Sequence, residues 1–339
     1  MGDTGARADW LDVARAMAIV LVALFHSALL LMQEHLTSPV WATINSAFVT
    51  FRMPLFFLAS GLLAGSAIRR SWGGLWNTRL ALLVWVLAIW SIIRFLFFTA
   101  VPLDSRLYES DPRGLLLAFV LPSTGLWFLH ALAVFLVVAK LAQPLPVWIQ
   151  LTTAAVLSVL FFSVLHLDSL SWDGMGKYLI FFLAGLYGRS ALTRFTAQPR
   201  PAIGILAVLA FGVAGLSVEL LDLASVPGVL LAVSCLAILV GVTWARILSD
   251  TRLVGPLRYL GRRTLPIYVM HVLVVAGLCA ALGAADLDLG LGVTLALPVI
   301  VCAAAITVSL LVHSLAVRTP LVYLYRAPSF LLLPRVRAS

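Results

Sequence analysis

The chain has very few charged residues for its length. Asp, Glu, Lys and Arg make up 11% of its 339 residues, whereas a soluble domain has roughly a quarter. Hydrophobic residues make up 62% of the chain, in runs long enough to cross a bilayer. This composition excludes a soluble globular domain and predicts an all-α, polytopic integral membrane protein.

Cysteine is also scarce, and no cluster has the spacing of metal ligands. The three cysteines, Cys235, Cys279 and Cys302, lie inside apolar runs, which is typical of packing residues. The histidines and carboxylates are not grouped in any metal-binding pattern. We therefore expect no bound metal and no bound cofactor.

Acidic residues are outnumbered, with 14 Asp and Glu against 23 Lys and Arg, a net charge of +9. An excess of this size can indicate a nucleic-acid partner, but its distribution indicates membrane orientation instead.

Using about 20 apolar residues per span, we predict about ten transmembrane helices, near 11–32, 45–67, 80–100, 124–141, 147–166, 176–190, 202–219, 226–246, 264–283 and 291–317. The run 114–122 is too short to span and predicts an interfacial or re-entrant piece.

The connections between these spans alternate in charge. One set holds most of the arginines, including Arg69, Arg194 and Arg258, and the other holds most of the carboxylates, including Asp168 and Asp286. Because Lys and Arg mark cytoplasmic loops, both termini are predicted to be cytoplasmic. All connections are short, and the first apolar run is too long for a signal-peptide core. The expectation is a single transmembrane domain over 1–339, surrounded by membrane lipids.

The first predicted helix, in RADWLDVARAMAIVLVALFHSALLL (7–31), carries both Arg15 and His26. Eleven positions are close to three turns, so both side chains share one helix face, about 16 Å apart along the axis. Arg15 is close enough to the helix start to snorkel to the headgroups, and a lone histidine can be a satisfied hydrogen-bonding residue. The alternative is that both line a polar cavity.

Other polar residues fall inside the predicted spans. Arg52, Arg94 and His130 lie at about the depth of His26 in the outer half, which favours a shared cavity over independent snorkelling. Ser60 follows Pro54 in FRMPLFFLASG (51–61) and lacks a nucleophile-elbow motif, so packing is favoured there. Arg262 and Arg263 open the ninth span, where they could meet a phosphate or only mark the cytoplasmic side, and His271 lies two turns further in.

These residues resemble the membrane acyltransferase family 3. The Arg15–His26 pattern, FRMPLFFLASG, TGLWFLHALAVF (124–135) and YLGRRTLPIYVMH (259–271) occur in the family's order, with its ten-helix count. His130 stands where an aromatic residue is expected, and only Arg79 precedes the third span, where paired arginines are common. The C-terminal esterase-like domain of some members is absent, which leaves open whether a partner protein completes the transfer.

The resemblance implies an O-acyltransferase of the plasma (inner) membrane. Such proteins move an acyl group, often acetyl, from cytoplasmic acyl-CoA to a hydroxyl of an extracytoplasmic glycan or lipid-linked sugar. It implies His26 as the catalytic residue and Arg15 as a donor-handling residue. We assign Arg52, Arg94, His130, Ser60, Arg262, Arg263 and His271 to substrate binding. A transporter or flippase for a lipid or glycan is the alternative, although no paired broken helices indicate one.

Overall fold

The computed structural model describes residues 3–120, 124–285 and 290–334. Ten helices of 15 or more residues form the body: α1 (Asp3–Gln33), α3 (Val49–Ile68), α5 (Ala81–Ala100), α7 (Trp127–Leu141), α8 (Val147–Ser163), α9 (Leu170–Tyr187), α11 (Pro201–Leu220), α12 (Val229–Leu248), α14 (Thr264–Ala284) and α15 (Leu291–Ala316). The described residues contain no strand, which confirms the all-α class. Each predicted span coincides with one of these helices.

Within the described ranges, seven helical stretches are long and apolar enough to cross a membrane, among them Asp9–Gln33, Val49–Ile68 and Trp72–Ala100. Helices α7 and α8 are apolar but have only 15 and 17 residues. Helix α9 begins at Leu170, earlier than the predicted 176, because its first turns continue through Asp173 and Lys177, which pair one turn apart. The sequence pattern missed this start because both residues are charged.

Short helices occupy the connections. They are α2 (Val40–Ala47), α4 (Trp72–Leu75), the π-helix η1 (Trp76–Leu80), η2 (Asp104–Ser110), α6 (Pro112–Leu116), α10 (Arg189–Phe195), η3 (Leu223–Ser225), α13 (Val254–Gly261), η4 (Pro320–Leu324) and η5 (Ser329–Leu331). The run predicted as an interfacial piece, 114–122, begins inside α6 and extends beyond its end at Leu116. Residues 121 and 122 of that run lie outside the described residues.

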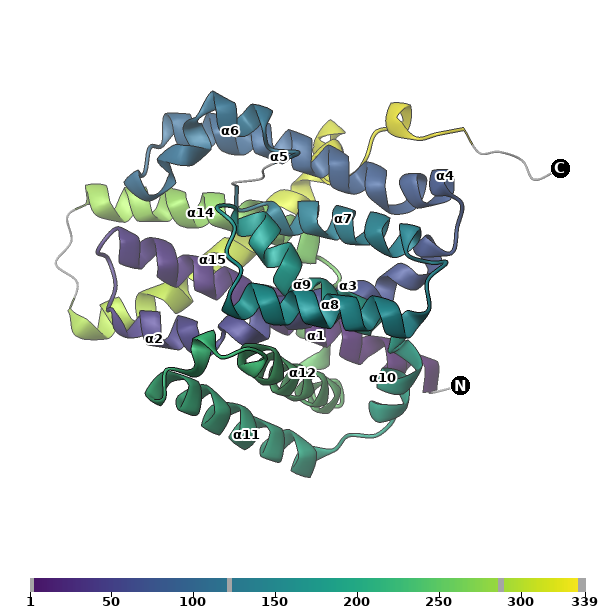
Figure 1. Ribbon diagram of the computed structural model, residues 1–339. Helices are drawn as coiled ribbons and strands as arrows, with labels where there is room; N and C mark the ends of the chain where they lie inside the picture. The colour runs from purple at the N-terminus through teal and green to yellow at the C-terminus, as the bar shows by residue number, and fades with distance from the viewer. Residues whose placement is uncertain (1–2, 121–123, 286–289, 335–339) are drawn as a thin grey trace.

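The charged connections lie at two opposite ends of the bundle (Figure 1). The start of α1, α4 and α10 lie at one end, and α2 and α6 lie at the other. The connections that carry Arg69 and Arg194 therefore share an end with the N-terminus. This arrangement agrees with the charge alternation, and we call this end the basic end and the opposite one the acidic end.

Helix α11 has an apolar stripe that other helices leave uncovered. Leu206, Leu209, Val213, Leu216 and Leu220 recur at helical spacing, and each is more than half exposed. In water this stripe would be a large exposed apolar patch, whereas in a bilayer it meets lipid tails. The stripe and the apolar helices identify a multi-pass membrane protein.

Helix α1 lies inside the bundle. It packs against α3, α12, α14 and α15, and α13 covers its first turns. Val13, Ile19 and Leu30 of α1 are fully buried. Because protein surrounds α1, polar side chains on it can face other helices rather than lipid.

Helices α3 and α9 cross at a contact between two glycines. A Cβ built on Gly61 would lie 2.0 Å from the Phe182 carbonyl oxygen, and one built on Gly185 would lie 2.1 Å from that of Leu58. Only glycine permits backbones this close, as at other small-residue crossings in membranes. The crossing fixes α3, which carries Arg52 and Ser60.

We expect Gly61→Ala to destabilise the protein by about 1–3 kcal/mol, because its methyl group must push α9 away. Gly212→Ala in α11 is the matched control, since a Cβ at that position would have no atom within 4 Å. Thermal unfolding in detergent should show a lower Tm for the first variant only. Equal melting of the two variants would contradict the close crossing.

Candidate active site

His26 of α1 and His271 of α14 meet inside the bundle. The Nδ1 of His26 lies 3.2 Å from Nε2 of His271, and the ring centroids are 5.0 Å apart. His271 is 1% exposed and His26 is half-buried. Two residues 245 positions apart thus form one polar pair, which brings together two of the site residues predicted from sequence.

The backbone partners of the two rings define their tautomers. Nδ1 of His271 lies 2.9 Å from the Ile267 carbonyl oxygen, and Nδ1 of His26 lies 2.9 Å from that of Val22. A carbonyl oxygen can only accept, so both Nδ1 atoms carry the proton. Nε2 of a neutral His271 then accepts from His26 Nδ1–H. That N–H group is therefore shared between His271 Nε2 and the Val22 carbonyl oxygen. Nε2 of a neutral His26 keeps its lone pair and has no hydrogen-bond partner among the described residues.

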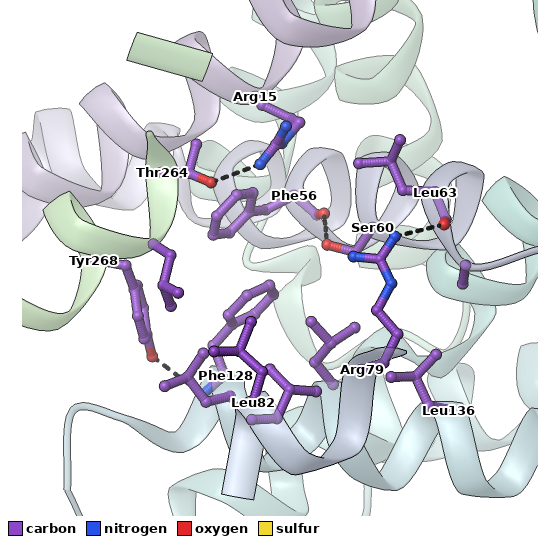
Figure 2. Close-up of a pocket in the computed structure, with 15 residues that line it drawn as sticks. Arg15, Phe56, Ser60, Leu63, Arg79, Leu82, Phe128, Leu136, Thr264 and Tyr268 are labelled. Carbon is purple, nitrogen blue, oxygen red and sulfur yellow. Dashed lines mark hydrogen bonds between the residues drawn. The ribbon is translucent and has the colours of Figure 1, made fainter. Parts of the chain in front are cut away.

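A cavity of about 160 Å³ lies toward the basic end of the bundle (Figure 2). Its two cations are Arg15, which donates to Thr264 Oγ1 at 2.9 Å, and Arg79, which donates to the Leu63 carbonyl oxygen at 3.1 Å. Leucines, including Leu82 and Leu136, form much of the wall. The cavity combines positive charge with an apolar surface, which suits an anionic group that carries an alkyl or pantetheine-like arm.

An aromatic layer bounds this cavity on the side of His271. Phe56 stacks on Phe128 with centroids 4.5 Å apart, and Phe128 contacts the Tyr268 ring at 5.4 Å. The Tyr268 hydroxyl accepts from the Phe128 backbone N–H and donates to the Gly125 carbonyl oxygen. Tyr268 also lies beside His271, with centroids 6.1 Å apart. This layer therefore separates the cavity from the histidine pair.

A buried ion-pair cluster lies beyond the pair, toward the acidic end. Arg94 donates two hydrogen bonds of 2.7 Å to Glu109, and Arg106 donates to the same carboxylate at 3.3 Å. All three side chains are less than a tenth exposed. Arg94 Nη1 and Arg106 Nε have no partner among the described residues, so the cluster keeps donors and net positive charge.

Arg52 is the other buried cation near the pair. Its guanidinium lies 4.1 Å from the centroid of Phe25, the neighbour of His26, and it forms no ion pair with any described residue. Arg52 thus places a positive charge against the residue that precedes His26 in α1. A group that develops negative charge beside His26 would therefore be stabilised.

Comparison with known proteins gives the family of this chain. The family described as "Acyltransferase domain", acyltransferase 3, matches residues 8–314. The chain belongs to the acyltransferase 3 family. This is the family that the sequence motifs indicate.

A relative of this acyltransferase is the inner membrane protein YcfT of Escherichia coli (strain K12). The two are 28% identical over an aligned length of 173 residues, and the match covers 43% of this chain. The match spans about half of that relative's length, 48%. No solved structure matches the chain.

The remaining predicted site residues of this acyltransferase lie apart from the histidine pair. Ser60 lines the cavity and donates to the Phe56 carbonyl oxygen, as a packing role predicts. Arg262 donates to Asp12 at 2.8 Å, and Arg263 stacks on Tyr259 at 3.8 Å. His130 contacts Ser171 and Trp172. Arg52, Arg94 and His130 do not line the cavity, which lies in the basic half rather than the predicted outer half.

Sequence analysis misses Glu109 and Arg106. The charge pattern assigns Glu109 to an acidic loop outside the membrane, but η2 folds back against α5 and buries its carboxylate on Arg94. The available signal is Arg94 itself, since an arginine inside a span favours an anionic partner, and Glu109 is one of the first acids along the following loop.

We expect Glu109→Gln to destabilise the protein by about 3–5 kcal/mol, because it leaves two buried guanidinium groups without their carboxylate. Glu219→Gln is the control, since it makes the same chemical change at an exposed position. Thermal unfolding of both variants in detergent checks this. A Glu109→Gln variant as stable as the control would mean that the cluster is solvated.

Proposed function

We propose that this acyltransferase moves an acyl group, often acetyl, from cytoplasmic acyl-CoA to a hydroxyl of an extracytoplasmic glycan or lipid-linked sugar. It would act in the plasma (inner) membrane, with acyl-CoA as co-substrate and no bound cofactor. The observation that carries the proposal is the position of the histidine pair. It lies between a cation-lined cavity on the basic side and a buried cationic cluster on the acidic side.

In direct transfer, Nε2 of His26 accepts the proton of the acceptor hydroxyl as its oxygen attacks the thioester carbonyl carbon. The tetrahedral intermediate then expels the CoA thiolate, which takes the proton from His26 Nε2–H. In the rival route Nε2 itself attacks the thioester carbonyl carbon, the C–S bond breaks, and the CoA thiolate leaves an acylated His26. The acceptor hydroxyl then attacks that acyl group, its proton passes to the thiolate, and the bond to Nε2 breaks. In both routes His271 holds the lone pair of His26 on Nε2.

The cations on the two sides have different roles in this proposal. Arg52 and the unpaired donors of Arg94 and Arg106 stabilise the oxyanion that forms beside His26. Arg15 and Arg79 bind the anionic part of the donor, with Arg262 and Arg263 at the cytoplasmic mouth. The leucine wall of the cavity holds the arm that carries the thioester. The Phe128 and Tyr268 side chains must move for that thioester to reach His26.

His26→Ala should lower kcat at least about 10²-fold, as expected for removal of a general base or nucleophile. His271→Ala should lower kcat with little change in either KM, because it removes only the group that orients His26. His271→Gln should recover part of the rate, since its side-chain oxygen can accept from His26 Nδ1–H.

The measurement is product formation by purified variants in liposomes, with melting curves to show folding. His166→Gln, at an exposed histidine, is the control. Full turnover by folded His26→Ala would refute the assignment, and a rise in donor KM for His271→Ala would indicate a binding role.

Donor and acceptor should reach the site from opposite sides of the membrane. In sealed vesicles of known orientation, acyl-CoA on the cytoplasmic side should acylate an acceptor confined to the other side. Arg15→Ala should raise the donor KM more than the acceptor KM. A requirement for both substrates on one side would refute the through-membrane route. Acceptor movement without acylation would support the transporter alternative, and dependence on an added protein would identify a transfer partner.

A further inference from the structure

The segment after α15 is hydrogen-bonded to side chains of η1 and α5. We define residues 320–333, which include η4 and η5, as the strap. The indole N–H groups of Trp76, Trp85 and Trp90 donate to the carbonyl oxygens of Leu331, Tyr323 and Leu324, at 2.7, 2.6 and 2.8 Å. Three tryptophans thus donate to the backbone of the strap, and the rings of Trp85 and Trp90 also contact its Phe330 and Tyr325 side chains.

Asn77 makes the most specific of these contacts. Its amide Nδ2 donates to the Leu333 carbonyl oxygen at 2.9 Å, and its Oδ1 accepts from the Leu333 backbone N–H at 2.8 Å. Both hydrogen-bonding groups of one residue of the strap are therefore bound by a single side chain. Such a two-point contact fixes orientation as well as distance.

Trp76 and Asn77 belong to the π-helix η1 (Trp76–Leu80), and so does Arg79. A π-helix is a rare, wider turn that is frequently found at functional sites. Positions 77 and 79 point to nearly opposite sides of a helical turn. Arg79 accordingly lines the cavity (Figure 2). Asn77 contacts the strap, so the turn connects the strap to the cavity.

We propose that the strap, through Asn77, holds η1 in the turn that places Arg79 in the donor cavity. Asn77 is then a positioning residue for donor binding, and the inference rests on the proposed acyl-CoA function. Among the described residues, the Arg79 side chain forms one hydrogen bond, to the Leu63 carbonyl oxygen, and no ion pair. The strap limits the movement of Arg79 from the opposite side of the turn.

The first test measures the position of residue 79 without any donor. In a Cys235→Ser background, Arg79→Cys is labelled with a small negatively charged methanethiosulfonate, with and without Asn77→Ala. A severalfold change in the labelling rate caused by Asn77→Ala supports the proposal that the strap positions residue 79. Thr78→Ala is the matched control, because Thr78 belongs to the same turn but bonds only to the Gly74 carbonyl oxygen. An unchanged rate in Asn77→Ala overturns the inference.

The second test is a double-mutant cycle on CoA binding. Leu333→Pro removes the backbone N–H that Asn77 accepts from, and extended Leu332 (φ −87°, ψ 133°) tolerates a following proline. Asn77→Ala and Leu333→Pro should each raise the Kd for CoA about fivefold, the scale of one hydrogen bond. The double variant should bind CoA no more weakly than Asn77→Ala alone, because Asn77→Ala already removes the hydrogen bond that Leu333→Pro removes.

Arg79→Ala separates the two levels of the proposal. If Arg79→Ala weakens CoA binding but Asn77→Ala does not, the proposed role of the strap is refuted. The assignment of the cavity to donor binding is then retained. If the unmodified protein does not bind CoA, the assignment of the cavity to the donor is wrong. The labelling rate alone then tests whether the strap positions residue 79. Additive effects of Asn77→Ala and Leu333→Pro on the Kd for CoA would also overturn the inference. They would show that the two substitutions do not act through one shared contact.

Discussion

The cost of burying charge in a bilayer is the constraint on which this structure depends. A guanidinium group in the hydrocarbon region costs several kcal/mol unless it faces protein, water or an opposite charge. Arg15, Arg52, Arg79, Arg94 and Arg106 all lie within or next to the bundle, and each has a different solution. Arg94 and Arg106 share Glu109, Arg52 stacks on Phe25, and Arg15 and Arg79 line a cavity. Each solution needs a neighbouring helix, so the position of the charges determines which helices must pack together.

The sequence predicts the parts of this arrangement that lie along one helix. Hydropathy places the ten helices, and charge alternation places their connections. Spacing puts Arg15 and His26 on one face of α1. Those inferences hold because the periodicity of a helix and the cost of charge in lipid act locally along the chain.

The contacts between helices could not be predicted in the same way. Nothing local in the sequence indicates that His26 meets His271, 245 positions away, or that His130 packs against Trp172. Depth along the membrane normal gives Arg52, Arg94 and His130 the same level, but two side chains at one level can face different neighbours. The close crossing at Gly61 and Gly185 and the π-helix at 76–80 likewise depend on tertiary contacts.

The use of a second histidine as the partner of His26 follows from the same constraint. In many hydrolases a carboxylate orients the catalytic histidine. In this protein, three guanidinium groups and one carboxylate already lie around the pair. A further carboxylate there would be drawn into an ion pair with Arg52 or Arg106 and would no longer hold the imidazole. Neutral His271 accepts the Nδ1 proton of His26 without adding charge, and its own Nδ1 is fixed by the Ile267 carbonyl oxygen in the same helix. The positive charge then remains available for the oxyanion of the proposed reaction, at the position where it develops.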